Sequence, residues 1–471
     1  MAAGFWIYYL MANLIRAAPR ATSALLPPLH RLTTTRALST EFSANLDFRR
    51  LGVDVAAAQR EIDARCASGD AAEVWRLHGA VIDAKLRVDA VRTERNALSK
   101  LGKQGKLDAA TIAVGRRLKV DLADAEATLR SAEAALDGVA RQIPNTTHAA
   151  TPVGDEDTAV VRYESPRAAR DFPARDHLEI CRELGLADFE GAARTTGSKF
   201  AFLRGAGVWL EMALTQWAMR RLAENHGFAP LACPDLVRSS IVEGCGFTPR
   251  DSAESSSQIY RVESSPLSLS ATAEIALAGL HAETTHDAES LPLRLAGVSH
   301  CFRTEAGARG SEDRGLYRLH QFTKVEMFVV APPEESETIF EELVAVQRSL
   351  YDELELPYRQ LEMPTEELGA SAHRKVDTEA WMPGRGGGDG AYGEICSTSN
   401  CTDFQSRRLR VRMKRRDAAK TEYPHLLNGT ACAVPRVIVA ILENGQRPDG
   451  SVDIPRALHP FMPDGMDRLE A

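Results

Sequence analysis

The chain has 471 residues, of which 44% are hydrophobic and 26% charged, as in a globular protein of two or three domains. Its formal net charge of −8 excludes nucleic-acid binding through overall basic character, so any such contact must be local. No apolar run approaches the roughly 18 residues that span a bilayer, so we expect no membrane partner. The eight cysteines form no C-x-x-C pair, which argues against a zinc site and against a secreted disulfide framework.

The first predicted segment, residues 1–40, differs in composition from the rest of the chain. It is rich in Ser and Thr, has no acidic residue before Glu41, and carries four arginines: Arg16, Arg20, Arg31 and Arg36. This composition is typical of a mitochondrial transit peptide and predicts a location in the mitochondrial matrix. A disordered tail and a secretory signal are the alternatives, but the arginines lie beyond the apolar run. Met11 could also be the true start.

The region from Ala71 to Ile143 predicts two long helices. Apolar residues recur at steps of three, four or seven: Leu77, Val81, Ala84, Val88, Val91 and Leu98, then Leu118, Leu122, Ala125, Leu129, Ala132, Leu136, Val139 and Ile143. The polar stretch LGKQGKLD, with Gly102 and Gly105, separates the two runs. Heptad spacing on both sides of a short turn predicts an N-terminal antiparallel helical coiled-coil arm, which we assign to residues 41–150.

The end of this arm is predicted to be basic. Ten basic and three acidic residues lie between Lys85 and Lys119, in a chain that is acidic overall. A solvated helix face is the simplest explanation, but the local excess favours a contact with a phosphate backbone. The candidate contact residues are Arg92, Arg95, Lys100, Lys103, Lys106, Arg116 and Arg117.

Residues 151–471 are predicted to form a second domain. After Pro144 a polar stretch rich in turn formers predicts a linker. Helical patterns at 209–225 and 334–355 then alternate irregularly with strand patterns at 294–304 and 316–330. Such an order predicts an α+β fold with an antiparallel sheet and flanking helices, not a doubly wound parallel sheet. No G-x-x-x-x-G-K-[ST] phosphate loop occurs, so any ATP must bind by other means.

The segment from Phe302 to Glu326 carries the most chemistry. Arg303 and Glu305 are two residues apart on a predicted extended run and so should point to one face. After the glycine-containing loop, Phe322, Lys324 and Glu326 should share a face of the return strand for the same reason. Such a face would suit a nucleotide and a small polar amine. A hairpin with a solvated charged face is the alternative.

Several long motifs resemble those of seryl-tRNA synthetases in the class II aminoacyl-tRNA synthetase family. They are FRTEAG with HQFTKVE in Phe302–Glu326, LSLSATAEI at Leu267–Ile275, GEICS at Gly393–Ser397, and HLLNGTACAVPRVIVAILEN at His425–Asn444. HGFAPLACPDLV, with Pro234, resembles the family's motif 1, which forms the dimer contact. The resemblance runs from about residue 48 to Met462 and implies the class II antiparallel sheet and a homodimer.

The resemblance also implies an ATP site. Arg303 and Arg436 would be catalytic, contacting the α- and γ-phosphates. Phe322 would stack under the adenine, and Glu305 would lie near its exocyclic amine. The ATP-binding residues would be Arg303, Thr304, Glu305, Leu319, His320, Gln321, Phe322, Glu394, Ile395, Cys396, Ser397 and Arg436. Glu394 and Ser397 resemble the pair that ligates Mg²⁺ through hard oxygen atoms.

The substrates implied by the resemblance are L-serine, ATP and tRNA(Ser). Serine would be bound by Thr272, Ala273, Glu274, Glu326 and Thr430. A pocket that hydrogen-bonds the serine hydroxyl would reject alanine because the pocket's own groups would be left unpaired. Two rivals remain: a catalytically inactive paralogue with a binding or regulatory role, and a ligase that loads a carrier protein. The catalytic residues argue against the first, and the arm argues against the second.

The sequence departs from the usual family pattern in three places. Pro435 precedes Arg436 where glycine or threonine is more frequent, but proline suits the first turn of a helix. The resulting CAVPR resembles animal mitochondrial seryl enzymes, in agreement with the leader. Cys396 replaces a more common serine. Asp313 stands where threonine is frequent, in a loop that in the family meets the tRNA acceptor end.

Overall fold

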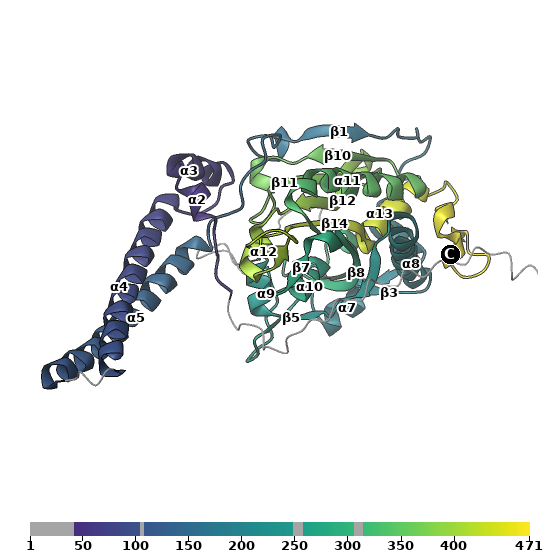
Figure 1. Ribbon diagram of the computed structural model, residues 1–471. Coiled ribbons are helices and arrows are strands. Elements are labelled where there is room, and N and C mark those ends of the chain that lie inside the picture. Colours follow the sequence, from purple (N-terminus) through teal and green to yellow (C-terminus); the bar gives the residue numbers. More distant parts are fainter. Residues whose placement is uncertain (1–41, 104–107, 248–257, 306–313) are drawn as a thin grey trace, which may run out of the picture. The chain divides into compact units, whose positions relative to one another are not determined.

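The computed structural model describes residues 42–103, 108–247, 258–305 and 314–471 (Figure 1). All of them fall in the second of two compact units, which begins at Leu38. The predicted leader, 1–40, the turn residues Gly105 and Lys106, and Asp313 lie outside the described residues, as does the side chain of Lys103. No helix within the described ranges is long and apolar enough to cross a membrane.

The predicted helical hairpin is present. After the short helices α2 (Phe48–Leu51) and α3 (Val55–Ala64) come α4 (Ala71–Lys103) and α5 (Ala109–Ala140), which lie side by side (Figure 1). Two ion pairs show that they run antiparallel, because Arg92 pairs with Glu126 while Lys85, seven residues earlier, pairs with Glu133. Most of the predicted apolar positions of the seam are buried: Val81, Ala84, Val88, Val91, Leu118, Leu122, Ala125 and Leu136. Leu77, Leu98, Leu129, Ala132 and Val139 are partly buried and pack against them.

The ends of these helices differ slightly from the prediction. Gly102, expected in the turn, belongs to α4, and Ile143 lies beyond the end of α5. Asp108 caps α5, since its carboxylate accepts a hydrogen bond of 2.7 Å from the backbone N–H of Thr111. This bond satisfies one of the free N–H groups at a helix start.

The expected linker after Pro144 is fixed at its start. The buried guanidinium of Arg65 donates to four backbone carbonyls, those of Asn145, Thr146, Gly369 and Ala372. The Asn145 side chain in turn donates to the carbonyls of Ser371 and Cys401, each at 2.8 Å. Polar composition suggested a loose connection here, but its polar groups are used in these buried hydrogen bonds.

An eight-stranded sheet forms the second domain, in the order β1-β10-β11-β12-β14-β9-β8-β4 (Figure 1). The strands are β1 (Val160–Glu164), β4 (Ala229–Ala232), β8 (Leu293–Phe302), β9 (Gln321–Ala331), β10 (Tyr358–Glu362), β11 (Arg374–Met382), β12 (Ala391–Asn400) and β14 (His425–Ala433). Neighbours pair antiparallel except β4 and β8, which pair in parallel. The predicted α+β class with an antiparallel sheet is confirmed.

The smaller elements surround this sheet. The helices are α6 (His177–Glu183) and α7 (Phe189–Thr195), and the strands pair as β2 (Ala187–Asp188) with β3 (Phe202–Leu203), β5 (Leu236–Arg238) with β6 (Leu267–Leu269), β7 (Thr285–Asp287) with β13 (Arg412–Lys414), and β15 (Val452–Asp453) with β16 (Arg468–Leu469).

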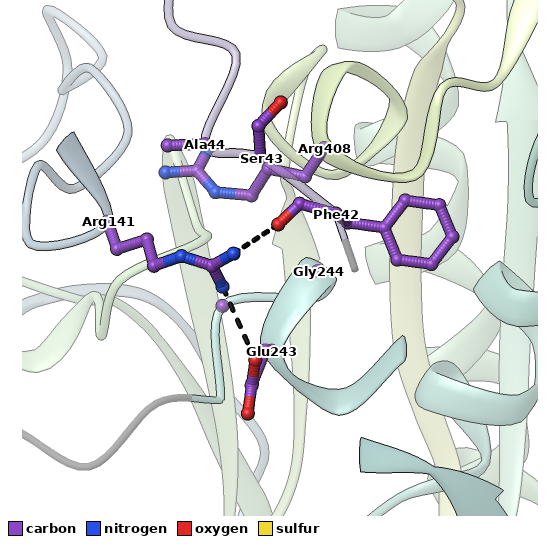
Figure 2. Close-up of a pocket in the computed structure, with 8 residues that line it drawn as sticks. Phe42, Ser43, Ala44, Arg141, Glu243, Gly244 and Arg408 are labelled. Atoms are coloured by element: carbon purple, nitrogen blue, oxygen red, sulfur yellow. Dashed lines mark hydrogen bonds and ion pairs between the residues drawn. The ribbon is translucent and has the colours of Figure 1, made fainter. Parts of the chain in front are cut away.

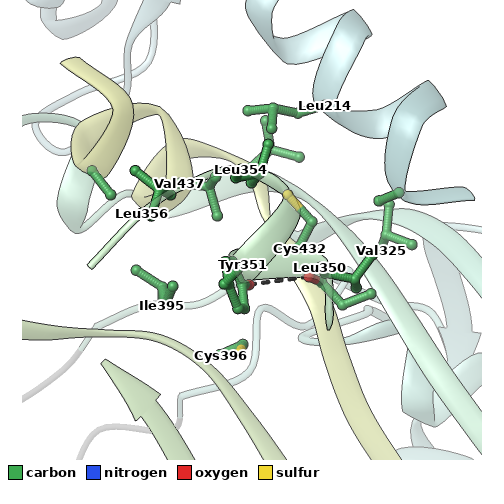
Figure 3. Close-up of a cluster of buried hydrophobic side chains, with 14 of the residues drawn as sticks. Leu214, Val325, Leu350, Tyr351, Leu354, Leu356, Ile395, Cys396, Cys432 and Val437 are labelled. Atoms are coloured by element: carbon green, nitrogen blue, oxygen red, sulfur yellow. Dashed lines mark hydrogen bonds between the residues drawn. The ribbon is translucent and has the colours of Figure 1, made fainter. Parts of the chain in front are cut away.

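Three helices, α8 (Ala206–His226), α11 (Ser336–Glu353) and α13 (Val434–Gly445), cover one face of the sheet and form the main core with it. Figure 3 shows part of this core, in which Tyr351 of α11 packs beside Ile395 and Cys432 and donates a 3.0 Å hydrogen bond to the Ala431 carbonyl. The other face carries a second apolar cluster with α9 (Ser239–Gly244), α10 (Ala273–Leu280) and α12 (Phe404–Leu409).

The predicted hairpin from residue 294 to residue 330 is present, with one correction. Its first strand is β8, but the return strand, expected from Leu316, begins only at Gln321. Gly315–Tyr317 form a 3-10 turn instead, in which Leu316 and Tyr317 are buried in the main core. Burial of these two apolar side chains overrides the alternating pattern that suggested a strand.

The segment before α2 is an integral part of the second unit. Figure 2 shows Phe42–Ala44 beside Arg141, which donates to the Phe42 carbonyl and pairs with Glu243 at 3.3 Å. The backbone N–H of Ala44 donates to Asp137 at 2.7 Å. The Phe42 ring, 2% exposed, packs with the α9, α10 and α12 cluster.

We predict that Phe42→Ala destabilises the protein by about 3 kcal/mol, because the change leaves a cavity in a closed apolar cluster. Val53→Ala is the control, since Val53 is 86% exposed and its loss should cost within about 0.5 kcal/mol. Urea unfolding of both variants measures the difference. Equal unfolding midpoints for the two variants would contradict the packing role of Phe42.

Candidate active site

The close approach of α10 to the sheet builds one half of the site. Gly297 of β8 pairs with Glu326 of β9. A Cβ on Gly297 would lie 2.8 Å from the Cys233 sulfur and 2.9 Å from Cδ1 of Leu277 in α10, closer than such atoms pack. Glycine therefore lets α10 lie directly on the strand. Because α10 begins just after Thr272, its N-terminal turn is held against Glu326.

The predicted serine-binding residues come together here, around a lysine. The Lys324 ammonium lies 2.8 Å from Oγ1 of Thr272, 2.5 Å from Oε2 of Glu326 and 3.4 Å from Oγ1 of Thr430. The Thr430 hydroxyl also donates to Glu326 at 3.2 Å. All four side chains are buried. Ala273 contributes apolar packing to the neighbouring cluster.

Glu274, the remaining predicted serine ligand, is also buried. Its Oε1 accepts a 2.6 Å hydrogen bond from Gln405 of α12. Burial and the nearby Glu326 carboxylate raise the pKa of Glu274 to about 7, although the Gln405 bond and the cations of Lys324 and Arg303 act in the opposite direction. This carboxylate therefore changes charge near neutral pH.

Five of the predicted nucleotide-binding residues line a cavity that adjoins this cluster: Arg303, Glu305, Leu319, Phe322 and Arg436. Its lining comprises Arg303, Glu305, Leu316, Tyr317, Arg318, Leu319, Phe322, Ala433, Pro435 and Arg436. Arg303 donates to the Ala271 carbonyl at 3.2 Å, and its guanidinium lies 5.4 Å from the centre of the Phe322 ring. Arg303 thus lies between the α10 start and the aromatic wall of the cavity.

The backbone conformation that brings Glu305 to the cavity differs from the extended run that the sequence pattern predicts. Strand β8 ends at Phe302, and Glu305 has a φ of 50°, so it does not continue an extended run with Arg303. Its carboxylate accepts a hydrogen bond of 2.7 Å from Arg318. A left-handed residue turns the chain sharply, and this turn, not strand alternation, aims the side chain.

Arg436 extends from the first turn of α13, next to Pro435. Its guanidinium donates to the Glu394 carboxylate at 2.8 Å and to the Glu394 carbonyl at 3.0 Å, and it lies 4.8 Å from the Tyr317 ring centre. Partial burial alone would raise the pKa of Glu394, but the Arg436 guanidinium and the Lys375 ammonium outweigh it and hold that pKa well below its usual range. Glu394 is therefore ionised at neutral pH.

A β-bulge brings Glu394 and Ser397 to one face. Residues three apart on a regular strand point to opposite faces. In β12, however, Cys396 pairs with Thr378 while Glu394 pairs with the next residue, Glu379, so that Ile395 is an extra residue. The bulge reverses the alternation, and Glu394 and Ser397 share the face opposite the main core.

The buried carboxylate of Asp377 lies on that face, opposite Ser397 in the register. Its Oδ2 is 2.8 Å from the Lys375 ammonium, while Oδ1 has no hydrogen-bond partner in the part of the chain that the structure describes. Burial raises the pKa of Asp377, against the effect of Lys375. Neither Asp377 nor Lys375 was predicted as a site residue, because only the fold brings them beside Glu394.

The other predicted nucleotide-binding residues are not part of the cavity lining. The His320 ring hydrogen-bonds the Tyr260 hydroxyl, and Thr304 donates its N–H to the Gln258 carbonyl. Gln321 pairs with Phe302 at the start of the hairpin. The side chains of Ile395 and Cys396 belong to the main core, so only their backbone atoms are available to a ligand.

Two contacts of the site were missed by sequence reasoning. Tyr317, expected in a strand, forms a wall of the cavity and donates to the Glu394 carbonyl at 3.1 Å. The spacing predicts that Lys324 shares a face with Phe322 and Glu326 but indicates no function for its ammonium group. Its alternation with those two residues was the signal that could have identified it.

On the arm, Arg92, Arg95, Lys100, Arg116 and Arg117 are all exposed. Arg92 pairs with Glu126 at 2.9 Å and Arg117 with Asp121 at 3.6 Å. Exposed pairs of this kind are weak and exchange readily for other anions. The predicted basic end of the arm is thus accessible at these positions.

Family models match two parts of the chain. Residues 260–445 match the tRNA synthetase class II core domain (G, H, P, S and T), and residues 46–147 match the seryl-tRNA synthetase N-terminal domain. The serine–tRNA ligase of Rhodopirellula baltica is 44% identical over 86% of this chain and 95% of its own length. That of Rubrobacter xylanophilus is 47% identical over 79% of this chain and 84% of its own.

Solved structures show the same similarity. The seryl-tRNA synthetase of Pyrococcus horikoshii complexed with ATP superimposes with a TM-score of 0.80 at 34% identity, covering 90% of this chain and 99% of that one. The cytoplasmic serine–tRNA ligase of Naegleria fowleri in complex with AMP gives 0.73 at 30% identity, covering 88% and 95%. On these matches and on the arrangement of its site, the chain belongs to the seryl-tRNA synthetase family of class II aminoacyl-tRNA synthetases.

Proposed function

We propose that this serine–tRNA ligase activates L-serine with ATP and transfers the seryl group to the 3′ end of tRNA(Ser) for translation in the mitochondrial matrix. The observation that carries the activity is the adjacency of two preformed groups. The polar cluster around Glu326 suits a small amino acid, and the cavity between Phe322 and Arg436 suits ATP. Arg303 lies where the two meet.

In the serine pocket, the two carboxylates would bind different groups of the substrate. Glu274, ionised above neutral pH, would bind the substrate ammonium, and Glu326 with Thr430 would hydrogen-bond the hydroxyl. Alanine would leave these buried groups unpaired, a loss that in such sites reaches about 10⁴-fold or more. Threonine would have to be excluded sterically, because its hydroxyl group would make the same hydrogen bonds as that of serine.

In the nucleotide cavity, Phe322 would stack on the adenine and Glu305 would lie near its exocyclic amine. Arg303 would hold the α-phosphate, and Arg436 the γ-phosphate. The serine carboxylate is already ionised, so it attacks the α-phosphorus without a general base. A phosphorus–oxygen bond forms to serine, the bond to the β-phosphate breaks, and pyrophosphate leaves. The arginines accelerate this step by positioning and charge neutralisation.

The second step transfers the seryl group. A hydroxyl of the terminal ribose of the tRNA attacks the carbonyl carbon of seryl-adenylate. The ester bond to tRNA forms, the bond to the phosphate breaks, and AMP leaves with the electron pair while the hydroxyl proton passes to the departing phosphate. This step needs no nucleophilic side chain from the protein.

Glu394 and Ser397 would hold Mg²⁺ against the phosphates of ATP. Their shared face and the ionised state of Glu394 fit a hard cation. Within the described ranges no three side chains of His, Cys, Asp or Glu form a metal-binding group, so phosphate oxygens and water would complete the coordination. When bound, the ion would neutralise charge on the phosphates.

We propose the division of the chain as a leader at 1–40, a tRNA-binding arm at 41–150 and a catalytic domain at 151–471, in a homodimer. The acid-free leader and the CAVPR sequence support the mitochondrial location. The exposed basic residues of the arm support its contact with the tRNA backbone.

We predict that pyrophosphate exchange by the chain without its leader depends on serine among the twenty amino acids. Arg303→Ala should lower exchange about 100- to 1,000-fold, since it removes a preorganised charge from the reacting phosphate. Arg294→Ala is the matched control. Arg294 lies on β8, the strand that leads to Arg303, but it pairs with Glu342 at 2.5 Å, so its loss should leave exchange unchanged. Absence of serine-dependent exchange would refute the proposed activity and favour an inactive paralogue.

We predict that replacing Arg95, Lys100 and Arg116 together with Ala leaves exchange intact but weakens tRNA charging. Each lost phosphate contact should reduce the slope of log affinity against log salt by about 0.7 to 0.9. Arg76→Ala is the control, because Arg76 is also an exposed arginine of α4 but lies outside the basic segment from Lys85 to Lys119. Normal charging by the triple variant at moderate salt would show that the arm does not bind tRNA through these residues.

We predict that residues 1–40 fused to a fluorescent protein direct it into mitochondria of animal cells. Changing Arg16, Arg20, Arg31 and Arg36 to Gln should leave the fusion in the cytosol, because the leader then loses its positive charge. Microscopy and cell fractionation measure the distribution. Cytosolic fluorescence with the native leader would overturn the proposed location without affecting the proposed activity.

A further inference from the structure

Lys324 stands at the centre of the proposed serine pocket, although the reaction as described gives it no role. Its side chain is only 5% exposed. Burying an ammonium costs several kcal/mol unless charge and hydrogen bonds compensate it. Here it lies within hydrogen-bond distance of three oxygens, on Thr272, Glu326 and Thr430. An ammonium has three donors, so each donor has one acceptor.

These three oxygens come from three different elements. Thr272 caps α10, Glu326 is in β9, and Thr430 is in β14. The contacts also orient the hydroxyls. The Thr430 oxygen accepts from Lys324 while its proton goes to Glu326 at 3.2 Å. The Thr272 oxygen accepts from Lys324 and, at 3.3 Å, from the backbone N–H of Glu274.

We propose that Lys324 is a positioning residue of the serine pocket, whose ammonium holds Thr272, Glu326 and Thr430 in the one arrangement that recognises the serine hydroxyl and ammonium groups. This inference rests on the proposed function. One carboxylate oxygen of Glu326 is engaged by Lys324 and Thr430. The carboxylate is thereby fixed, and its second oxygen is directed as an acceptor for the substrate.

The position of Lys324 also affects Glu274, the other carboxylate of the pocket. The groups that face Glu274 are Gln405 from α12, Glu326 and Lys324 from β9, Arg303 beyond β8, and the thiols of Cys245 and Cys401. Lys324 and Arg303 are the two cations among them, and both lower the pKa of Glu274. Loss of Lys324 would raise that pKa and keep Glu274 neutral to higher pH.

The test compares Lys324→Met and the more conservative Lys324→Gln with the unmodified chain, in pyrophosphate exchange between about pH 6 and pH 9. A broken buried charge pair should raise KM for serine about 100-fold or more, with KM for ATP changed by less than about 3-fold. In the unmodified chain KM for serine should fall as pH rises through the pKa of Glu274. In both variants that fall should shift to higher pH.

Selectivity gives a third readout. The ratio of kcat/KM for serine to that for alanine should decrease in both variants, because the hydroxyl acceptors are no longer fixed. Arg374→Met is the matched control. It removes another buried cation, paired with Glu362 of β10 and Glu337 of α11, but one that touches no proposed substrate residue. It should lower thermal stability and leave KM for serine, its pH profile and the selectivity unchanged.

Three outcomes would overturn the role of Lys324. One is an unchanged KM for serine in both variants. Another is an equal rise in KM for serine and for ATP, which would indicate general loss of structure. The last is an unshifted pH profile in a folded variant. Failure of the proposed function is distinguishable, because then the unmodified chain itself would show no serine-dependent exchange.

Discussion

Charge buried on one face of a β-sheet is the constraint on which this structure depends. Glu274, Lys324 and Glu326 lie almost out of contact with water, and such groups are tolerated only when each has a partner. Lys324 and Glu326 pair with each other on β9, but their remaining partners, Thr272 and Thr430, come from distant segments. The start of α10 and the facing strand β14 must therefore lie close to β9, and Gly297 makes the first of these approaches possible.

One face of the sheet packs against the main core, and the opposite face carries the charged side chains of the site. The face covered by α8, α11 and α13 contains a continuous apolar core, which supplies most of the burial that stabilises the fold. The opposite face is apolar only beside α9, α10 and α12, and elsewhere presents charged side chains. β12 has a register shift at Ile395, and β14 has one between Thr430 and Cys432. Each shift reverses which side chains point to the core, so both strands contribute residues to the core on one face and to the site on the other.

Much of this arrangement could be predicted from local sequence. Heptad spacing identified α4 and α5, and two-residue alternation placed Phe322 and Glu326 on one face, because both patterns depend on residues near in sequence. The α+β class followed from the order of elements. The resemblance to the family motifs then identified the serine-binding and ATP-binding residues, most of which the structure brings together around Arg303.

What could not be predicted depended on contacts between distant segments. The expected strand at Leu316 is a buried turn, Glu305 adopts a left-handed conformation, and the polar stretch after Pro144 is fixed by Arg65. In each case a tertiary contact overrides a local preference. The importance of Lys324 was hidden for the same reason, since its acceptors Thr272 and Thr430 lie 52 and 106 residues away in the chain.

The bulge at Ile395 has a consequence for how this protein can change during evolution. Because the bulge places an extra residue between Glu394 and Ser397, the spacing of these two side chains along the strand depends on the length of the segment more than on the identity of the residues between them. Apolar exchanges at Ile395 or Cys396 alter only packing in the core. A single-codon deletion there would restore regular pairing and keep both side chains on one face, but it would bring them closer together along the strand, so related genes should vary in sequence at this point more readily than in length.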